Sequence, residues 1–173
     1  MDLKAYIREI PDFPQPGVSF KDITPIFVDP AAFRYAVAEL ARAFREERID
    51  MVVGIESRGF LIGAPLAYEL GTGFVVVRKE GKLPRDTLHV DYELEYGTNR
   101  LEIHRDALQP GQRVVIADDL LATGGTVDAT AQLVQQLGGV IVGFGFLVEL
   151  DYLHGRRRLE GYPGKVVSLV HFS

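Results

Sequence analysis

Two neighbouring acids, Asp118 and Asp119, follow an apolar run and precede a segment of small residues. The apolar residues 114–117 predict a buried strand that ends at the two carboxylates, and residues 122–126 lead into a predicted helix. Ligands of parallel α/β sheets bind beyond the carboxyl ends of the strands. Carboxylates are strong hydrogen-bond acceptors. The pair is therefore suited to hold two vicinal hydroxyls of a sugar.

Segment 122–126 reads Ala-Thr-Gly-Gly-Thr and has the composition of a phosphate-binding loop. Gly124 and Gly125 carry no Cβ that would obstruct an anion, while Thr123 and Thr126 add hydroxyl donors. Backbone N–H groups at the start of the following helix favour a negative charge. The segment is not a Walker A loop and contains no GxGxxG motif. A plain strand–turn–helix junction capped by Thr126 is the structural alternative.

Cations in two other segments indicate a second anion site. Ser57 and Arg58 follow the apolar residues 51–55, so they are expected in the same layer as Asp118. A guanidinium there can bind a pyrophosphate with two parallel hydrogen bonds. Three more cations stand within five residues, namely Arg78, Lys79 and Lys82. Such a cluster can bind an anion, whereas an isolated run of this kind is usually a solvated turn.

Apolar runs alternate with amphipathic segments along the chain, which predicts an α/β fold. The predicted strands are residues 51–55, 74–77, 114–117, 140–148 and 166–170, and the predicted helices are about 30–47, 60–70 and 126–137. The strand segments do not alternate with polar residues, so both faces of the sheet are expected to be covered. Strands that alternate with helices imply a mostly parallel sheet with right-handed crossovers.

Two segments depart from this pattern. Residues 11–25 hold four prolines and Gly17, which predicts a rigid, irregular flap. Residues 79–101 are rich in charge, glycine and tyrosine, and they predict either a functional lid or an antiparallel hairpin that projects from the sheet. The strand 166–170 is expected to pair with the flap or with an edge of the sheet.

Length and composition restrict the class of protein. The 173 residues fit one domain, 1–173, and the net charge of −5 argues against nucleic-acid binding. The chain has no cysteine, no N-terminal signal segment and no apolar run that would span a membrane, so we expect a cytoplasmic protein. The four histidines lack metal-binding spacing, and residues 156–158 form a basic run that we interpret as a solvated turn or helix start.

Residues 114–126 resemble the signature that binds 5-phosphoribosyl 1-pyrophosphate (PRPP) in type I phosphoribosyltransferases. Three further segments resemble the adenine-using members of this family in the expected order: residues 13–25, residues 54–60, and residues 78–84 continued by 92–97. The resemblance implies a mostly parallel sheet flanked by helices. It also implies a small N-terminal hood of about residues 1–28 and a mobile catalytic loop of about residues 79–99.

The resemblance also implies a role for each candidate site residue. Asp118 and Asp119 would bind the ribose hydroxyls. The 5′-phosphate would be bound by Ala122, Thr123, Gly124, Gly125 and Thr126. Pyrophosphate would be bound by Ser57, Arg58, Arg78, Lys79 and Lys82. Adenine would be bound by Ser19, Phe20, Lys21 and Leu120. Glu95, Arg58 and Tyr96 would serve catalysis. By analogy with the family, the peptide bond between Glu56 and Ser57 is expected to be cis.

The activity implied by the resemblance is purine salvage, in which adenine and PRPP give AMP and pyrophosphate. Mg²⁺ would be held mainly by PRPP, with Asp118 or Asp119 reaching it directly or through water. The family suggests a homodimer. Two other functions remain open: a phosphoribosyltransferase for a 6-oxopurine or another base, and a non-catalytic regulator that senses PRPP or a purine. The latter would keep the binding loop without catalysis.

Overall fold

A seven-stranded sheet forms the centre of the molecule in a computed structural model, which describes residues 1–93 and 98–173. Its strands are β3 (Met51–Ile55), β4 (Gly73–Lys79), β5 (Thr87–Glu93), β6 (Thr98–His104), β7 (Arg113–Leu121), β8 (Val140–Leu150) and β9 (Lys165–Phe172). Their order is β5-β6-β4-β3-β7-β8-β9. Five neighbouring strands, β4, β3, β7, β8 and β9, are parallel to one another, which confirms the predicted sheet.

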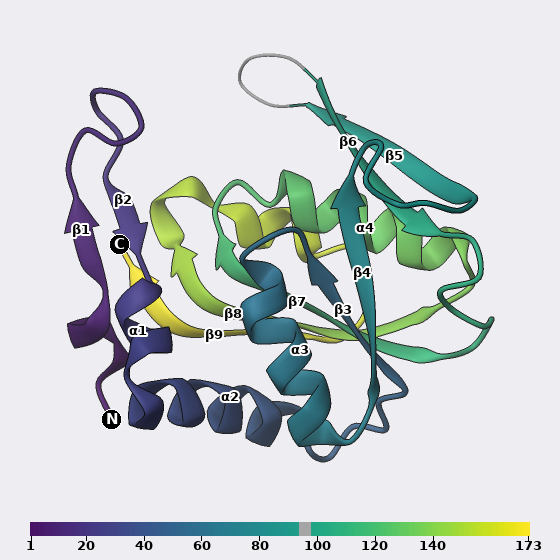
Figure 1. The fold of residues 1–173 in the computed structure, drawn as a ribbon, viewed down its shortest axis with the longest axis horizontal. Coiled ribbons are helices and arrows are strands. Elements are labelled where there is room, and N and C mark those ends of the chain that lie inside the picture. The colour runs from purple at the N-terminus through teal and green to yellow at the C-terminus, as the bar shows by residue number, and fades with distance from the viewer. Residues whose placement is uncertain (94–97) are drawn as a thin grey trace.

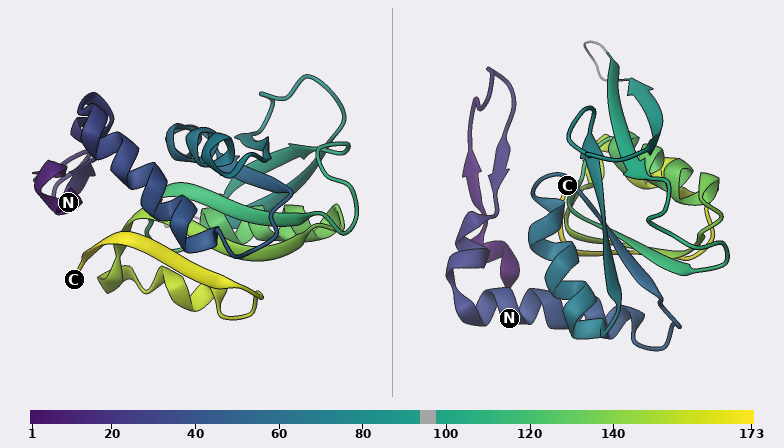
Figure 2. Two further views of the ribbon diagram at one scale, coloured as in Figure 1. Left: turned by 90° about the horizontal axis from the view of Figure 1, so that it is seen from below. Right: turned by 45° about the vertical axis from the view of Figure 1, so that its right-hand side comes forward.

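Helices cover both faces of this sheet (Figures 1 and 2). The longer ones are α2 (Pro30–Phe44) and α3 (Gly59–Leu70) on one face and α4 (Gly125–Gln136) on the other. Asp29 caps α2, because its carboxylate accepts hydrogen bonds from the N–H groups of Ala31 and Ala32. Helix α2 ends at Phe44, earlier than the predicted end near residue 47.

The core divides into two clusters because side chains of a strand alternate between the faces of a sheet. Val52 and Val115 pack in the cluster under α2 and α3, whereas Val53 and Ile116 pack in the cluster under α4. All four side chains are fully buried. This two-sided burial explains why these strands are continuous apolar runs in the sequence.

The two segments that depart from the alternating pattern both contain regular elements, although residues 11–25 were predicted to be irregular. The N-terminal region holds the short elements η1 (Leu3–Tyr6), β1 (Arg8–Ile10), β2 (Phe20–Asp22) and α1 (Thr24–Val28). Strands β1 and β2 pair with each other as a separate hairpin beside the main sheet (Figure 1). The hairpin predicted as one alternative for residues 79–101 is present in the described residues, because β5 and β6 pair antiparallel and β6 continues the sheet next to β4. The role of a lid stays a prediction.

The C-terminal strand β9 pairs with β8 and forms an edge of the sheet, which decides between the two alternatives for it. Between β8 and β9 lie two 3₁₀ helices, η2 (Asp151–Leu153) and η3 (Gly155–Leu159). No helix in residues 1–93 and 98–173 combines the length and apolar character needed to cross a bilayer.

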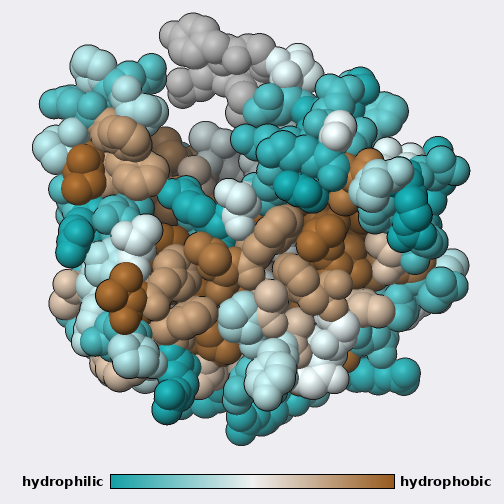
Figure 3. Space-filling view, viewed as in Figure 1, coloured by the Kyte–Doolittle hydropathy of each residue, from teal (hydrophilic) through white to brown (hydrophobic). Residues whose placement is uncertain are grey.

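Large apolar side chains also reach the surface on the face that carries α1, α2 and α3 (Figure 3). Val28 is 82% exposed and Tyr68 is 88% exposed. A groove of about 570 Å³ lies between α2 and α3, where Phe33 and Val37 face Pro65 and Tyr68. Exposed apolar patches of this kind commonly mark contacts with another protein.

Candidate active site

A cavity of about 380 Å³ opens at the carboxyl ends of β3 and β7. The predicted site residues that line it are Ser57, Arg58, Lys79, Asp118, Asp119, Leu120, Ala122 and Thr126. The cavity therefore joins the acid pair, the segment before α3 and the two ends of the predicted phosphate loop 122–126. Four other residues line it that the sequence did not assign to the site, namely Glu56, Tyr92, Asn99 and Leu101.

The two acids lie inside β7, so the prediction that the strand ends at them is wrong. Pairing of β7 with β3 stops at Ala117, but pairing with β8 continues to Leu121. Because β3 ends at Ile55 and its pairing with β7 stops at Ala117, the acids border the cavity on that side while β8 holds their backbone on the other. The start of α3 approaches closely, since a Cβ on Gly59 would lie 2.5 Å from Asp118 Oδ1.

Arg58 provides the positive charge nearest to the acid pair. Its Nε lies 2.9 Å from Asp119 Oδ2, and the Asp119 N–H donates to Asp118 Oδ1 at 2.9 Å. Burial and the adjacent charge of Asp119 raise the pKa of Asp118 well above its usual range. Burial also raises the pKa of Asp119, although the guanidinium of Arg58 opposes this shift. The two carboxyl groups thus place several hydrogen-bond acceptor oxygens close together, with the guanidinium of Arg58 beside them.

The phosphate loop turns tightly after β7. Gly124 has a φ of +84°, in the left-handed region where glycine is favoured, and α4 begins at the next residue. Gly124 is the N-cap and has no side chain, so the first N–H groups of α4 have no side-chain cap. Thr126 faces the cavity, whereas Thr123 is exposed on the same loop. Such a helix N-terminus favours a bound anion.

Glu56, which the sequence did not single out, binds the basic residues at the end of β4 and just after it. Arg78 Nε lies 3.3 Å from a Glu56 carboxylate oxygen, Lys82 pairs with the other oxygen, and the Lys79 N–H donates to Glu56 at 2.9 Å. Of the three predicted pyrophosphate ligands in this segment, only Lys79 lines the cavity, together with Ser57 and Arg58 from the segment before α3. The peptide bond from Glu56 to Ser57 is cis, as the family resemblance implied.

We predict that Glu56 makes stability depend on pH in the acid range. Burial raises its pKa, but hydrogen bonds from Lys82, the Lys79 N–H and Arg78 outweigh burial and lower the pKa from 4.5 to about 2. A depressed carboxyl pKa stabilises the fold above pH 4.5, and this contribution is lost as the pH falls towards 2. Glu56→Gln should therefore unfold at a lower temperature than the wild type at pH 7.

The measurement is the thermal midpoint of both proteins from pH 7 to pH 2, with the exposed Glu160→Gln as control. The difference between wild type and Glu56→Gln should shrink below pH 4.5. If the difference in thermal midpoint between the two proteins stays constant down to pH 2, ionised Glu56 is not the source of the pH-dependent stability.

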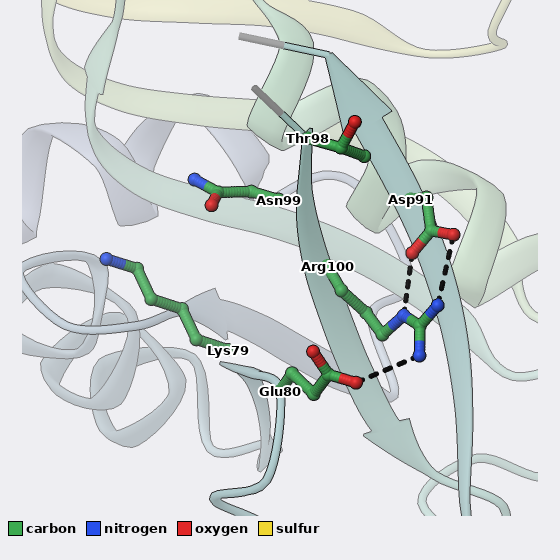
Figure 4. Close-up of a pocket in the computed structure, with 6 residues that line it drawn as sticks. All are labelled: Lys79, Glu80, Asp91, Thr98, Asn99 and Arg100. Carbon is green, nitrogen blue, oxygen red and sulfur yellow. Dashed lines mark hydrogen bonds and ion pairs between the residues drawn. The ribbon is translucent and has the colours of Figure 1, made fainter. Parts of the chain in front are cut away.

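A second cavity of about 440 Å³ adjoins the first, since Lys79 and Asn99 line both. Arg100 binds Asp91 through two nitrogens, at 2.6 and 3.2 Å, and Glu80 at 2.9 Å (Figure 4). Lys79 and Asn99 point away from this group of charges. The ion pairs thus connect the turn after β4 to the β5–β6 hairpin.

The predicted adenine residues of the hood, Ser19, Phe20 and Lys21, are not part of the cavity lining, and of the three Phe20 contacts a residue that is. Lys21 is buried, forms an ion pair with Glu9 and donates to Ser19 Oγ at 3.0 Å. These two side chains are therefore engaged within the β1–β2 hairpin. The ring of Phe20 contacts Arg58, whose guanidinium carbon lies 5.2 Å from the ring centroid. Phe20 thus brings the hood up to the residue that pairs with Asp119.

Two predicted catalytic residues, Glu95 and Tyr96, lie outside the described residues. Of the residues missed by the sequence analysis, Asn99 and Leu101 occur on β6 with the period of two that places alternate side chains on one face. That signal was present in the sequence, but the strand could not be placed beside the acid pair without the sheet order.

Comparison with known proteins gives the class to which this fold and site belong. The model of the phosphoribosyl transferase domain family matches residues 28–172. The chain therefore belongs to the phosphoribosyltransferase family.

The similarity extends to one kind of enzyme within that family. The chain is 57% identical to the adenine phosphoribosyltransferase of Thermoanaerobacter pseudethanolicus over 171 residues, covering 99% of this chain and 98% of the relative. The crystal structure of that enzyme superimposes with a TM-score of 0.95 and covers the same shares of the two chains. At this identity the chain falls among the adenine phosphoribosyltransferases.

Two similar structures contain ligands. Adenine phosphoribosyltransferase of Saccharomyces cerevisiae, complexed with adenine and an imino-altritol bisphosphate, is 43% identical with a TM-score of 0.90 and 96% coverage of both chains. The enzyme of Trypanosoma brucei, in complex with AMP, pyrophosphate and ribose-5-phosphate, is 25% identical with a TM-score of 0.89. The superposition with the Trypanosoma enzyme covers 98% of this chain and 77% of that enzyme.

Proposed function

We infer that this chain transfers the 5-phosphoribosyl group of PRPP to adenine, giving AMP and pyrophosphate in purine salvage. The observation that carries this conclusion is that a single cavity joins the acid pair, the segment before α3 and the phosphate loop. The cavity occurs in a chain that is 57% identical to an adenine phosphoribosyltransferase. The ligands of the Saccharomyces and Trypanosoma enzymes are the ones we propose for this cavity.

The proposed binding mode follows the charges around the cavity. Asp118 and Asp119 accept hydrogen bonds from the ribose hydroxyls, and the loop 122–126 donates N–H groups to the 5′-phosphate. Arg58 and Lys79 face the pyrophosphate. This arrangement fixes the anomeric carbon between the loops, and positioning of this kind contributes strongly to the rate of a bimolecular reaction.

The reaction proposed for this site is a displacement at the anomeric carbon. Adenine N9 forms the new bond while the bond to pyrophosphate breaks, with inversion and an oxocarbenium-like transition state. The N9 proton leaves the base, and we assign its removal or the stabilisation of the positive charge to Glu95. Cations at the pyrophosphate stabilise the charge that develops on the leaving group.

Mg²⁺ fits this proposal as a partner of PRPP. The cavity offers two carboxylates, Asp118 and Asp119, and Mg²⁺ typically binds through one or two carboxylates together with substrate phosphates. When bound, the ion neutralises phosphate charge and assists departure of pyrophosphate. Among the described residues, the one group of three acids or histidines whose ligand atoms lie within 4.8 Å of one another is Glu149, Asp151 and His171, and none of them lines the cavity.

The base is proposed to bind between the hood and the end of β7. Leu120 lines the cavity and offers an apolar contact, and Phe20 approaches through its contact with Arg58. Backbone groups near Ser19 and Lys21 would read the edge of adenine. The division into a hood of about residues 1–28 and a mobile catalytic loop of about residues 79–99 remains a prediction from the family resemblance.

Turnover with a panel of bases tests the proposed function. The protein is assayed with PRPP and adenine, hypoxanthine, guanine or xanthine, each with Mg²⁺ and with excess chelator. We expect AMP formation from adenine, dependent on Mg²⁺. Preference for an oxopurine would reject adenine as the substrate, and binding of PRPP without any turnover would indicate a regulator.

We predict that Glu95→Gln lowers kcat more than it changes KM for PRPP. The amide keeps the shape of the side chain but can neither accept a proton nor carry a negative charge, and loss of such a group typically costs about 10²–10⁴-fold in rate. Steady-state kinetics with both substrates varied measures the effect, with Glu160→Gln as control. Wild-type kcat in Glu95→Gln would remove this residue from the catalytic assignment.

We further propose that the protein is a cytoplasmic homodimer. The exposed apolar side chains around the groove between α2 and α3 support self-association. Sedimentation velocity over a range of concentrations tests the dimer, and a monomer at micromolar concentration would reject it. Cell fractionation tests the compartment.

A further inference from the structure

The segment between β8 and β9 lies directly against the phosphate loop. A Cβ on Gly155 would lie 3.0 Å from the carbonyl carbon of Ala122 and still closer to its oxygen, which no side chain tolerates. In the opposite direction, a Cβ on Gly124 would lie 2.6 Å from the carbonyl oxygen of Gly155. The two backbones therefore touch without intervening side chains, and both glycines are buried.

An ion pair next to Gly155 fixes this segment to the sheet. The guanidinium of Arg156 donates to the two carboxylate oxygens of Glu149, at 2.9 and 2.6 Å, and to the carbonyl oxygen of Val166 at 3.0 Å. Glu149 is only 5% exposed and also accepts a hydrogen bond from Ser168 Oγ. Arg156 thereby connects η3 to both β8 and β9.

The Arg156–Glu149 ion pair lies next to the start of the phosphate loop, at the end of β7. Glu149 is the register partner of Leu121, the residue that immediately precedes Ala122. The chain thus leaves the sheet at Leu121 next to the anchored carboxylate and meets Gly155 one residue later. A displacement of η3 would consequently push on the carbonyl of Ala122 and on the turn at Gly124.

We propose that Gly155 is a positioning residue for the 5′-phosphate loop and that the Arg156–Glu149 pair holds it in place. This inference rests on the proposed function of residues 122–126. Gly155 touches no reacting atom. Because Gly155 has no side chain, the backbone of residues 122–126 packs directly against it. In that position the N–H groups of the loop converge on one phosphate.

The test is Gly155→Ala, with Gly161→Ala as the matched control. Gly161 is exposed, has no atom within 4 Å of an added Cβ and does not need a positive φ. A 1 Å displacement of a binding group can cost about 10²-fold. We expect Gly155→Ala to raise KM for PRPP and the dissociation constant of ribose 5-phosphate by about 10–100-fold. KM for adenine should change by less than about threefold, and Gly161→Ala should match the wild type.

Circular dichroism and the thermal midpoint report whether Gly155→Ala is folded. Arg156→Lys provides a second variant, because lysine keeps the charge but cannot bind Glu149 through two parallel hydrogen bonds. It should change KM for PRPP in the same direction by a smaller factor. Unchanged ribose 5-phosphate binding in a folded Gly155→Ala, or in Arg156→Lys where the alanine variant does not fold, overturns the inference. Equal losses of PRPP and adenine binding also overturn it.

The failure of the proposed function gives a different result. In that case the wild-type protein itself would neither bind ribose 5-phosphate in calorimetry nor convert adenine and PRPP to AMP. The wild-type titration is therefore performed first, and the variants are compared with it.

Discussion

The double variant Asp118→Asn with Asp119→Asn is expected to lower kcat/KM for PRPP by about 10²–10⁴-fold while the protein stays folded. A hydrogen bond to a charged group contributes about 1.5–3 kcal/mol, so two of them account for a factor of this size. Asparagine preserves the volume of each side chain. Because the pKa values of both acids are raised, the folded state disfavours their charged forms, and neutral amides should cause little loss of stability.

Initial rates with PRPP varied at saturating adenine measure this effect, and thermal unfolding verifies the fold. Asp106→Asn is the control, because Asp106 is an exposed acid that pairs with Arg85 and does not line the active-site cavity. Near-normal KM and turnover in the double variant would contradict the role of the pair in holding ribose.

Arg58→Gln is expected to lower kcat/KM for PRPP by about 10²–10³-fold and to shift the pH profile. Loss of one preorganised donor to developing charge typically has an effect of this size. Burial raises the pKa of Asp119 and Arg58 opposes the shift, so removal of the guanidinium should raise this pKa further. Use of PRPP requires the carboxylate and is lost as the pH falls through its pKa. The variant should therefore lose activity at a higher pH than the wild type.

The profile of kcat/KM from pH 5 to pH 9 measures the shift. Arg48→Gln serves as the control, because the side chain of Arg48 is 83% exposed and lies 3.7 Å from Asp50. An acid limb at the same pH in wild type and Arg58→Gln would show that Arg58 does not control the charge of Asp119.

The parallel sheet, its main helices and the acid pair with residues 122–126 could be predicted from the sequence alone. These features are local. A continuous apolar run predicts a strand buried on both faces, and an amphipathic segment predicts a helix. The acids, glycines and threonines of residues 118–126 stand next to one another in the chain, so their chemistry is visible without a fold.

The contacts between segments that are distant in the chain could be seen only in the folded structure. The strand β7 continues past the two acids because β8 still provides hydrogen-bond partners there, whereas β3 has already ended at Ile55. Glu56 binds Arg78 and Lys82 from 22 and 26 residues away, which leaves Lys79 to face the cavity. Gly155 reaches Ala122 because η3 folds back against the end of β7. Such contacts depend on strand order, register and loop path, which no local pattern of residues encodes.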